Sequence, residues 1–113
     1  MTTPRLKTDI WAAALMRRWN GNTEVVATLV RRGDADAGTV LLKISRLDGT
    51  ATVLSQTVAA DGNRAWMRGT GAAPVADAEA EAYIQRQRKR DPDLWVIEIE
   101  DRRGLFEPDE PVI

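Results

Sequence analysis

The sequence contains neither cysteine nor histidine. Without cysteine, the chain cannot form disulfides, use a thiolate nucleophile or bind a metal through sulfur. Without histidine, it lacks the commonest general base and the commonest metal ligand. These absences exclude the usual zinc sites and Ser-His-Asp triads. We therefore expect no bound metal and no cofactor.

Long hydrophobic runs are also missing. No apolar stretch approaches the roughly 18 residues of a membrane-spanning helix, so we expect no membrane association. The first residues, MTTPRLKTD, lack the apolar core and small-residue cleavage pattern of a secretory signal. A cytoplasmic protein of bacterial type is the simplest interpretation.

The composition is that of an ordinary globular protein, with 113 residues, 43% hydrophobic and 29% charged. This length predicts a single domain over residues 1–113 with a buried core. We expect a flexible lead-in at 1–7, an internal linker loop at 69–74 and an extended tail at 104–113. The net charge is −1, yet residues 91–113 carry two basic and eight acidic side chains.

Two stretches have helical character. VADAEAEAYIQRQRKR predicts a helix over about 76–90, because acidic residues crowd its first turns and basic residues its last. Ala80, Tyr83 and Ile84 would give it a packing face. IWAAALMRRW predicts a shorter N-terminal helix, with Trp11 and Trp19 on one face, although a strand at residues 9–19 is the competing interpretation.

The remaining runs are typical of strands. TEVVATLVRR, TVLLKISRL, TATVLSQTVA, RAWM and LWVIEIED are rich in β-branched or aromatic residues. Asp48-Gly49 and Asp61-Gly62-Asn63 predict tight turns between them. The sequence thus predicts an α+β fold: a meander of about five antiparallel strands with two helices.

The segment RRGDADAG, residues 31–38, is the first candidate site. Arg32, Asp34 and Asp36 could contact a ligand, but the spacing fails as a calcium loop and as a phosphate loop. It stands between two strand-like runs, where a hairpin turn belongs. We interpret it as a structural turn in which Gly33 and Gly38 supply positive φ.

The second candidate is RQRKRDPDLW. Four cations at the end of the second helix could meet phosphates, with Trp95 as a stacking platform. Asp91 and Asp93 would repel a nucleic-acid backbone, so a helix end capped by its own cations is the simpler interpretation. Trp19, at the end of the first helix, is a candidate interface anchor. The candidate binding residues are Trp19, Arg86, Arg88, Lys89, Arg90, Asp91, Asp93 and Trp95.

Carboxylates near the C-terminus form a third group. Glu98 and Glu100 would project from one strand face, close enough to share Mg²⁺ with Asp101. Alternating carboxylates on a strand are more often a solvated face that prevents edge pairing. We expect the solvated face.

Three stretches resemble the uncharacterised bacterial family catalogued as domain of unknown function 1491. They are RLKTDIWAAALMRR, RRGDADAGTVLLKI and EAYIQRQRKRDPDLWVIEIED. The chain departs from the family pattern at residues 16–20, where the resemblance implies a helix rich in alanine and glutamate. The resemblance implies no activity, cofactor or catalytic residues.

By exclusion, we interpret the chain as a small non-catalytic interaction or regulatory module, with a protein partner or a second copy of itself. One alternative is nucleic-acid binding through Arg31, Arg32 and the cations at 86–90. Another is a Mg²⁺-dependent enzyme that uses Glu98, Glu100 and Asp101.

Overall fold

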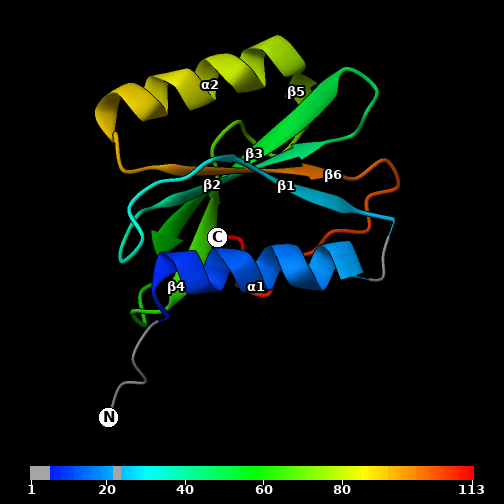
Figure 1. Ribbon diagram of the computed structural model, residues 1–113. Coiled ribbons are helices and arrows are strands. Elements are labelled where there is room, and N and C mark those ends of the chain that lie inside the picture. Colours follow the sequence, from blue (N-terminus) through cyan, green and yellow to red (C-terminus); the bar gives the residue numbers. More distant parts are fainter. Residues whose placement is uncertain (1–5, 22–23) are drawn as a thin grey trace.

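The computed structural model describes residues 6–21 and 24–113 as three layers (Figure 1). Helix α1 lies on one face of a sheet and helix α2 on the opposite face. No helix among the described residues is long and apolar enough to cross a membrane. The elements, in chain order, are α1 (Thr8–Gly21), β1 (Val26–Arg31), β2 (Val40–Ser45), β3 (Thr50–Val58), β4 (Arg64–Arg68), β5 (Val75–Ala76), α2 (Asp77–Arg90) and β6 (Trp95–Glu100).

The α+β class is confirmed, and the sheet is mostly antiparallel. Its strand order is β1-β6-β2-β3-β4, with the short β5 paired to β3. The expected meander holds from β2 to β4. It fails between β1 and β2, because β6 lies between them, antiparallel to β1 and parallel to β2.

Strand β6 occupies the middle of the sheet because it buries side chains on both faces. Trp95, Ile97 and Ile99 join the core beneath α1, whereas Val96 joins the core beneath α2. A strand with apolar side chains on both faces buries more apolar surface at the centre of a sheet than at an edge, and this burial is favourable. The alternating sequence pattern predicts that Trp95, Ile97 and Ile99 are buried on one face, but it does not predict the burial of Val96 on the other face.

The two short turns form where the sequence predicts them. Gly49 and Gly62 adopt φ values of 90° and 85°, which residues with a β-carbon rarely adopt. The Thr50 hydroxyl and N–H donate hydrogen bonds to Asp48, and these bonds lower the pKa of that carboxyl. The N–H of Asn63 bonds Asp61 and lowers its pKa in the same way.

Both helices are 14 residues long, so the N-terminal helix is not the shorter one. Residues 9–19 are helical, and the strand interpretation is wrong. Ala12 of α1 is fully buried, and Trp11 packs on Trp66 with ring centroids 5.8 Å apart. Helix α2 buries Ala80 and Ile84, as its sequence pattern predicts.

Candidate functional site

The RRGDADAG segment is not a hairpin loop. It passes over the start of β6 and reaches β2, which is not a neighbour of β1. The N–H of Asp34 donates to the main-chain oxygen of Asp93 at 2.9 Å, and the indole N–H of Trp95 donates to the main-chain oxygen of Asp34 at 2.8 Å. The guanidinium of Arg32 lies 5.0 Å from the centre of the Trp95 ring. The structure thus brings two candidate segments, 31–38 and 91–95, together.

The glycines of this loop serve close packing and not a positive φ, so the expectation for them is wrong. Gly33 and Gly38 are absent from the positive-φ residues. A β-carbon on Gly33 would overlap the main-chain oxygen of Asp93 and lie 2.6 Å from the Trp95 ring. One on Gly38 would lie 2.6 Å from that oxygen and 2.7 Å from the ring. Only glycine allows this approach.

The same loop covers the start of α1. The N–H of Asp9 donates to the main-chain oxygen of Ala35 at 3.0 Å, and that of Thr8 donates to the oxygen of Asp36 at 3.3 Å. The buried hydroxyl of Thr8 donates to the oxygen of Gly38 at 3.0 Å. The first N–H groups of a helix have no partners inside the helix. Here main-chain oxygens of the loop accept their hydrogen bonds. The structural role of the loop accounts for most of its polar groups.

The cations at the end of α2 are all exposed, which agrees with a helix end in contact with solvent. Arg86 lies over the Tyr83 ring at 6.0 Å, on its own helix. The N–H of Asp91 caps α2 through the Gln87 oxygen, and the Asp91 carboxylate accepts the Asp93 N–H at 3.0 Å. Trp95 is 1% exposed, so it is not available as a stacking platform for a base in this structure.

Trp19 lies apart from this group, against the C-terminal segment. It is half-buried, and its ring centroid is 4.9 Å from that of Phe106. Part of the ring is therefore accessible. Its role as an interface anchor stays a prediction.

The C-terminal carboxylates have structural partners. Asp101 is 2% exposed and accepts the N–H groups of Leu105 and Phe106 at 2.8 and 2.9 Å. Glu98 lies 3.4 Å from the ammonium of Lys43. Across the described residues, no three acidic side chains are grouped so as to hold a metal ion. Glu98 and Asp101 therefore pair with other groups of the protein.

Lys43 is a feature that the sequence did not reveal. It is central in β2, its side chain is 7% exposed, and its Nζ lies 2.7 Å from Asp77 and 2.5 Å from Glu81. Burial lowers the pKa of Lys43, but the hydrogen bonds and charges of Asp77 and Glu81 outweigh that effect and raise it. In the sequence, only the spacing of Asp77 and Glu81, one helical turn apart, indicated that their carboxylates lie on the same face of the helix.

The two long edges of the sheet differ. At β4, the C-terminal segment covers the edge: the Trp66 N–H donates to Pro111, and the Ile113 N–H donates to Trp66. At β1, β6 is the sole paired strand among the described residues. Val26 and Val30 of β1 are 49% and 60% exposed.

A groove lies beside this open edge, between β1 and α2. It has a volume of about 160 Å³. Helix α2 contacts β2, β3 and β5 but not β1, which leaves the groove uncovered. Its lining residues are Val30, Arg31, Lys43, Glu81, Ile84, Gln85, Arg88, Val96 and Glu98.

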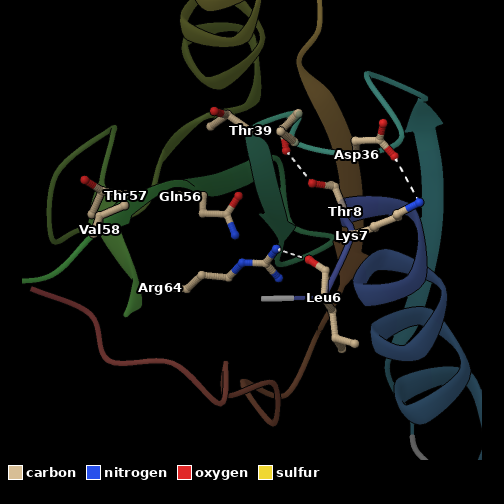
Figure 2. A pocket seen from close by; sticks show the side chains of 11 residues that line it. Leu6, Lys7, Thr8, Asp36, Thr39, Gln56, Thr57, Val58 and Arg64 are labelled. Carbon is tan, nitrogen blue, oxygen red and sulfur yellow. Dashed lines mark hydrogen bonds and ion pairs between the residues drawn. The ribbon is translucent and has the colours of Figure 1, made fainter. Parts of the chain in front are cut away.

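A larger hollow of about 430 Å³ lies on the other side of the molecule, where the start of α1 meets the ends of β3 and β4 (Figure 2). Gln56 and Arg64 extend into it, and Lys7 and Asp36 stand at its side. The guanidinium of Arg64 donates to the main-chain oxygen of Leu6 at 2.8 Å. Of the candidate loop residues, Asp36 alone lines this hollow.

Comparison with known proteins agrees with this fold. A family model described as "Protein of unknown function (DUF1491)" matches residues 6–106. The crystal structure of a DUF1491 family protein from Caulobacter crescentus CB15 has a TM-score of 0.80 and 44% identity, and the match covers 96% of this chain and 100% of that chain. The NMR structure of a DUF1491 family protein from the same organism has a TM-score of 0.79 and 44% identity, with 96% of each chain covered.

A solution structure from A. tumefaciens is more distant, with a TM-score of 0.73 and 26% identity over 93% of this chain and 98% of that one. No curated protein matches the chain. The family model and the 44% identical relatives both extend over nearly the whole sequence. The chain therefore belongs to the DUF1491 family of proteins of unknown function.

Proposed function

We propose that this protein is a non-catalytic interaction module that binds an extended segment of a partner protein along strand β1. The observation that carries the proposal is the difference between the two sheet edges. The β4 edge is covered by the chain's own C-terminal segment, whereas no strand pairs with the outer side of β1 among the described residues. There the Asn20 side-chain amide bonds the N–H and the main-chain oxygen of Ala27 at 2.7 and 2.8 Å. An open strand edge accepts an added strand through main-chain hydrogen bonds.

The side chains of β1 support the same proposal. Val26 and Val30 are exposed β-branched residues, which pack well against apolar side chains of a neighbouring strand. Charged residues flank the strand: the side chains of Glu24 and Arg32 are 62% and 59% exposed. An antiparallel segment with apolar residues at alternate positions, an acidic one opposite Arg32 and a basic one opposite Glu24 would fit this edge.

The bulge in β1 limits where such a segment can pair. The register with β6 shifts between Leu29 and Arg31, and a bulge disrupts regular pairing on an edge. We therefore place the contact on Val26–Leu29, with Val30 packing against the end of the added segment. At Ala27 that segment must displace the Asn20 side chain, which bonds the Ala27 main chain.

The test compares lysine substitutions at exposed apolar residues of the two edge strands. Val26→Lys and Val30→Lys place charges on the β1 edge, whereas Met67→Lys places one on β4, where the methionine is 48% exposed. Tagged proteins would be used to capture partners from the native host after nuclease treatment, with quantification by mass spectrometry. We expect a near-stoichiometric partner that the two β1 variants lose and the Met67 variant retains.

Hydrogen exchange would then locate the contact. A bound partner should slow amide exchange in residues 26–30 and leave β4 unchanged. Equal capture by wild type and both β1 variants would contradict the proposal, as would protection that excludes β1.

Nucleic-acid binding is the second candidate, favoured by one observation: Arg31 and Arg88 line the same groove. Glu81 and Glu98 line it too and would repel phosphates. The test is fluorescence anisotropy with single-stranded RNA and DNA at several salt concentrations. Binding that weakens steeply with salt and is lost in an Arg31→Gln, Arg88→Gln double variant would favour this candidate; no binding at low salt would remove it.

A further inference from the structure

We infer that the hollow between α1 and the ends of β3 and β4 binds a small oxyanion, the carboxylate or phosphate group of a small molecule, between Gln56 and Arg64. The hollow has a volume of about 430 Å³, a size at which small molecules are commonly held. Its described lining residues come from the start of α1, residues 36–39 and strands β3 and β4, and none of them comes from β1.

The orientation of the Gln56 amide is fixed by the main chain. Its oxygen accepts the N–H of Val40 at 3.2 Å. An amide that uses its oxygen in this way must turn its NH₂ group elsewhere. Figure 2 shows that nitrogen directed into the hollow, on the side of Arg64. Gln56 therefore offers hydrogen-bond donors to the hollow and not an acceptor.

Arg64 is held beside it. Val58 and Arg64 pair across β3 and β4, as do Gln56 and Trp66, so Gln56 and Arg64 are diagonal neighbours on one face of the sheet. The guanidinium lies 5.4 Å from the centre of the Trp11 ring and donates to the Leu6 oxygen. Two such contacts restrict its rotation and keep its charge at the hollow.

The surrounding charges favour an anion. Lys7 adds a second cation to the lining, and Asp36, the one carboxylate among the described lining residues, lies 3.6 Å from the Lys7 ammonium. Guanidinium and amide N–H groups together bind carboxylate and phosphate oxygens with charge-assisted hydrogen bonds. Leu6 and Val58 supply apolar wall for the carbon part of a ligand.

The test titrates sodium phosphate and sodium acetate separately into the ¹⁵N-labelled protein at constant ionic strength, followed by NMR. We expect saturable shifts of the Gln56 side-chain NH₂ and the Arg64 Nε–H with at least one probe. The probe that saturates at the lower concentration identifies the preferred oxyanion. Shifts that do not saturate with either probe, or that centre on Arg86–Arg90, would overturn the inference.

Matched variants identify the donors. Gln56→Glu keeps an acceptor for Val40 and replaces the donor with a negative charge, so it should weaken binding about tenfold or more. Arg64→Gln should weaken it similarly and Arg64→Lys less, whereas Arg68→Gln, also on β4 but outside the hollow, should bind like wild type. The NMR spectra themselves report whether each variant is folded. Wild-type affinity in the folded Gln56→Glu variant would overturn the inference.

Discussion

The indole N–H of Trp95 donates a 2.8 Å hydrogen bond to the main-chain oxygen of Asp34, which lies 61 residues earlier in the chain. This bond joins the loop that leaves β1 to the first residue of β6. The loop can approach so closely because Gly33 and Gly38 lie against the main-chain oxygen of Asp93 and the Trp95 ring. The central strand and the loop that crosses it therefore depend on each other.

The first prediction concerns these glycines. Gly33→Ala and Gly38→Ala should each lower the free energy of unfolding by about 1–3 kcal/mol, because the new methyl group overlaps the Asp93 oxygen and the Trp95 ring. Urea denaturation measures the change. Gly21→Ala is the matched control, since nothing lies within 4 Å of its β-carbon position. Wild-type stability for both loop variants would contradict this account of the packing.

The second prediction concerns the buried ammonium of β2. Lys43→Met should lower the free energy of unfolding by about 1–3 kcal/mol, because it leaves Asp77, Glu81 and Glu98 close together without their shared cation. Added salt should restore part of the loss, since these carboxylates are partly exposed. The control is Lys7→Met, whose exposed partner is Asp36 and which should cost no more than about 0.5 kcal/mol. A Lys43→Met variant as stable as wild type would show that the ion pairs contribute nothing.

The third prediction concerns the pH dependence of the difference in stability between wild type and Lys43→Met. The pKa of Lys43 is raised in the folded state above its ordinary value of 10.5. Its contribution to stability is therefore fully present below pH 10.5 and is lost as the pH rises toward the folded-state pKa. The difference in unfolding free energy between wild type and Lys43→Met should stay constant at neutral pH and shrink above 10.5. A difference that grows at alkaline pH would contradict the sign.

The fourth prediction concerns Asp101. Asp101→Ala should cost about 1–3 kcal/mol, because the N–H groups of Leu105 and Phe106 lose a charged acceptor in a buried position. Asp101→Asn keeps one acceptor oxygen and should cost less. Because Phe106 packs on Trp19, tryptophan fluorescence should change with the alanine variant. Glu100→Ala, in the adjacent half-buried residue, is the control. Equal stability of the Asp101→Ala and Glu100→Ala variants would contradict this role.

Local features of the fold were predictable, because each depends on residues close together in the chain. The Asp-Gly turns at 48–49 and 61–62 follow from backbone preferences of a few residues. Helix α2 follows from its charge distribution and its apolar spacing. The class of the fold and the resemblance to the DUF1491 family rest on the same local patterns.

The candidate sites were less predictable. RRGDADAG and DPDLW each stood out as unusual, but the sequence did not indicate that they contact each other. Gln56 and Arg64 are not among the predicted site residues, because a single glutamine and a single arginine in strands form no motif. Lys43 was missed for the same reason: a lysine in an alternating strand is usually exposed.

The sequence by itself determined helix α2, the turns, the absence of histidine and cysteine chemistry, and the apolar stripes that form the core. The tertiary structure alone decided that β6 enters between β1 and β2, which leaves β1 at an open edge. It also decided that Gln56 and Arg64 share a hollow and that three carboxylates surround Lys43. The physical reason is that strand pairing and buried charge contacts depend on residues far apart in the chain, whose meeting is selected by the total surface buried and not by any local preference.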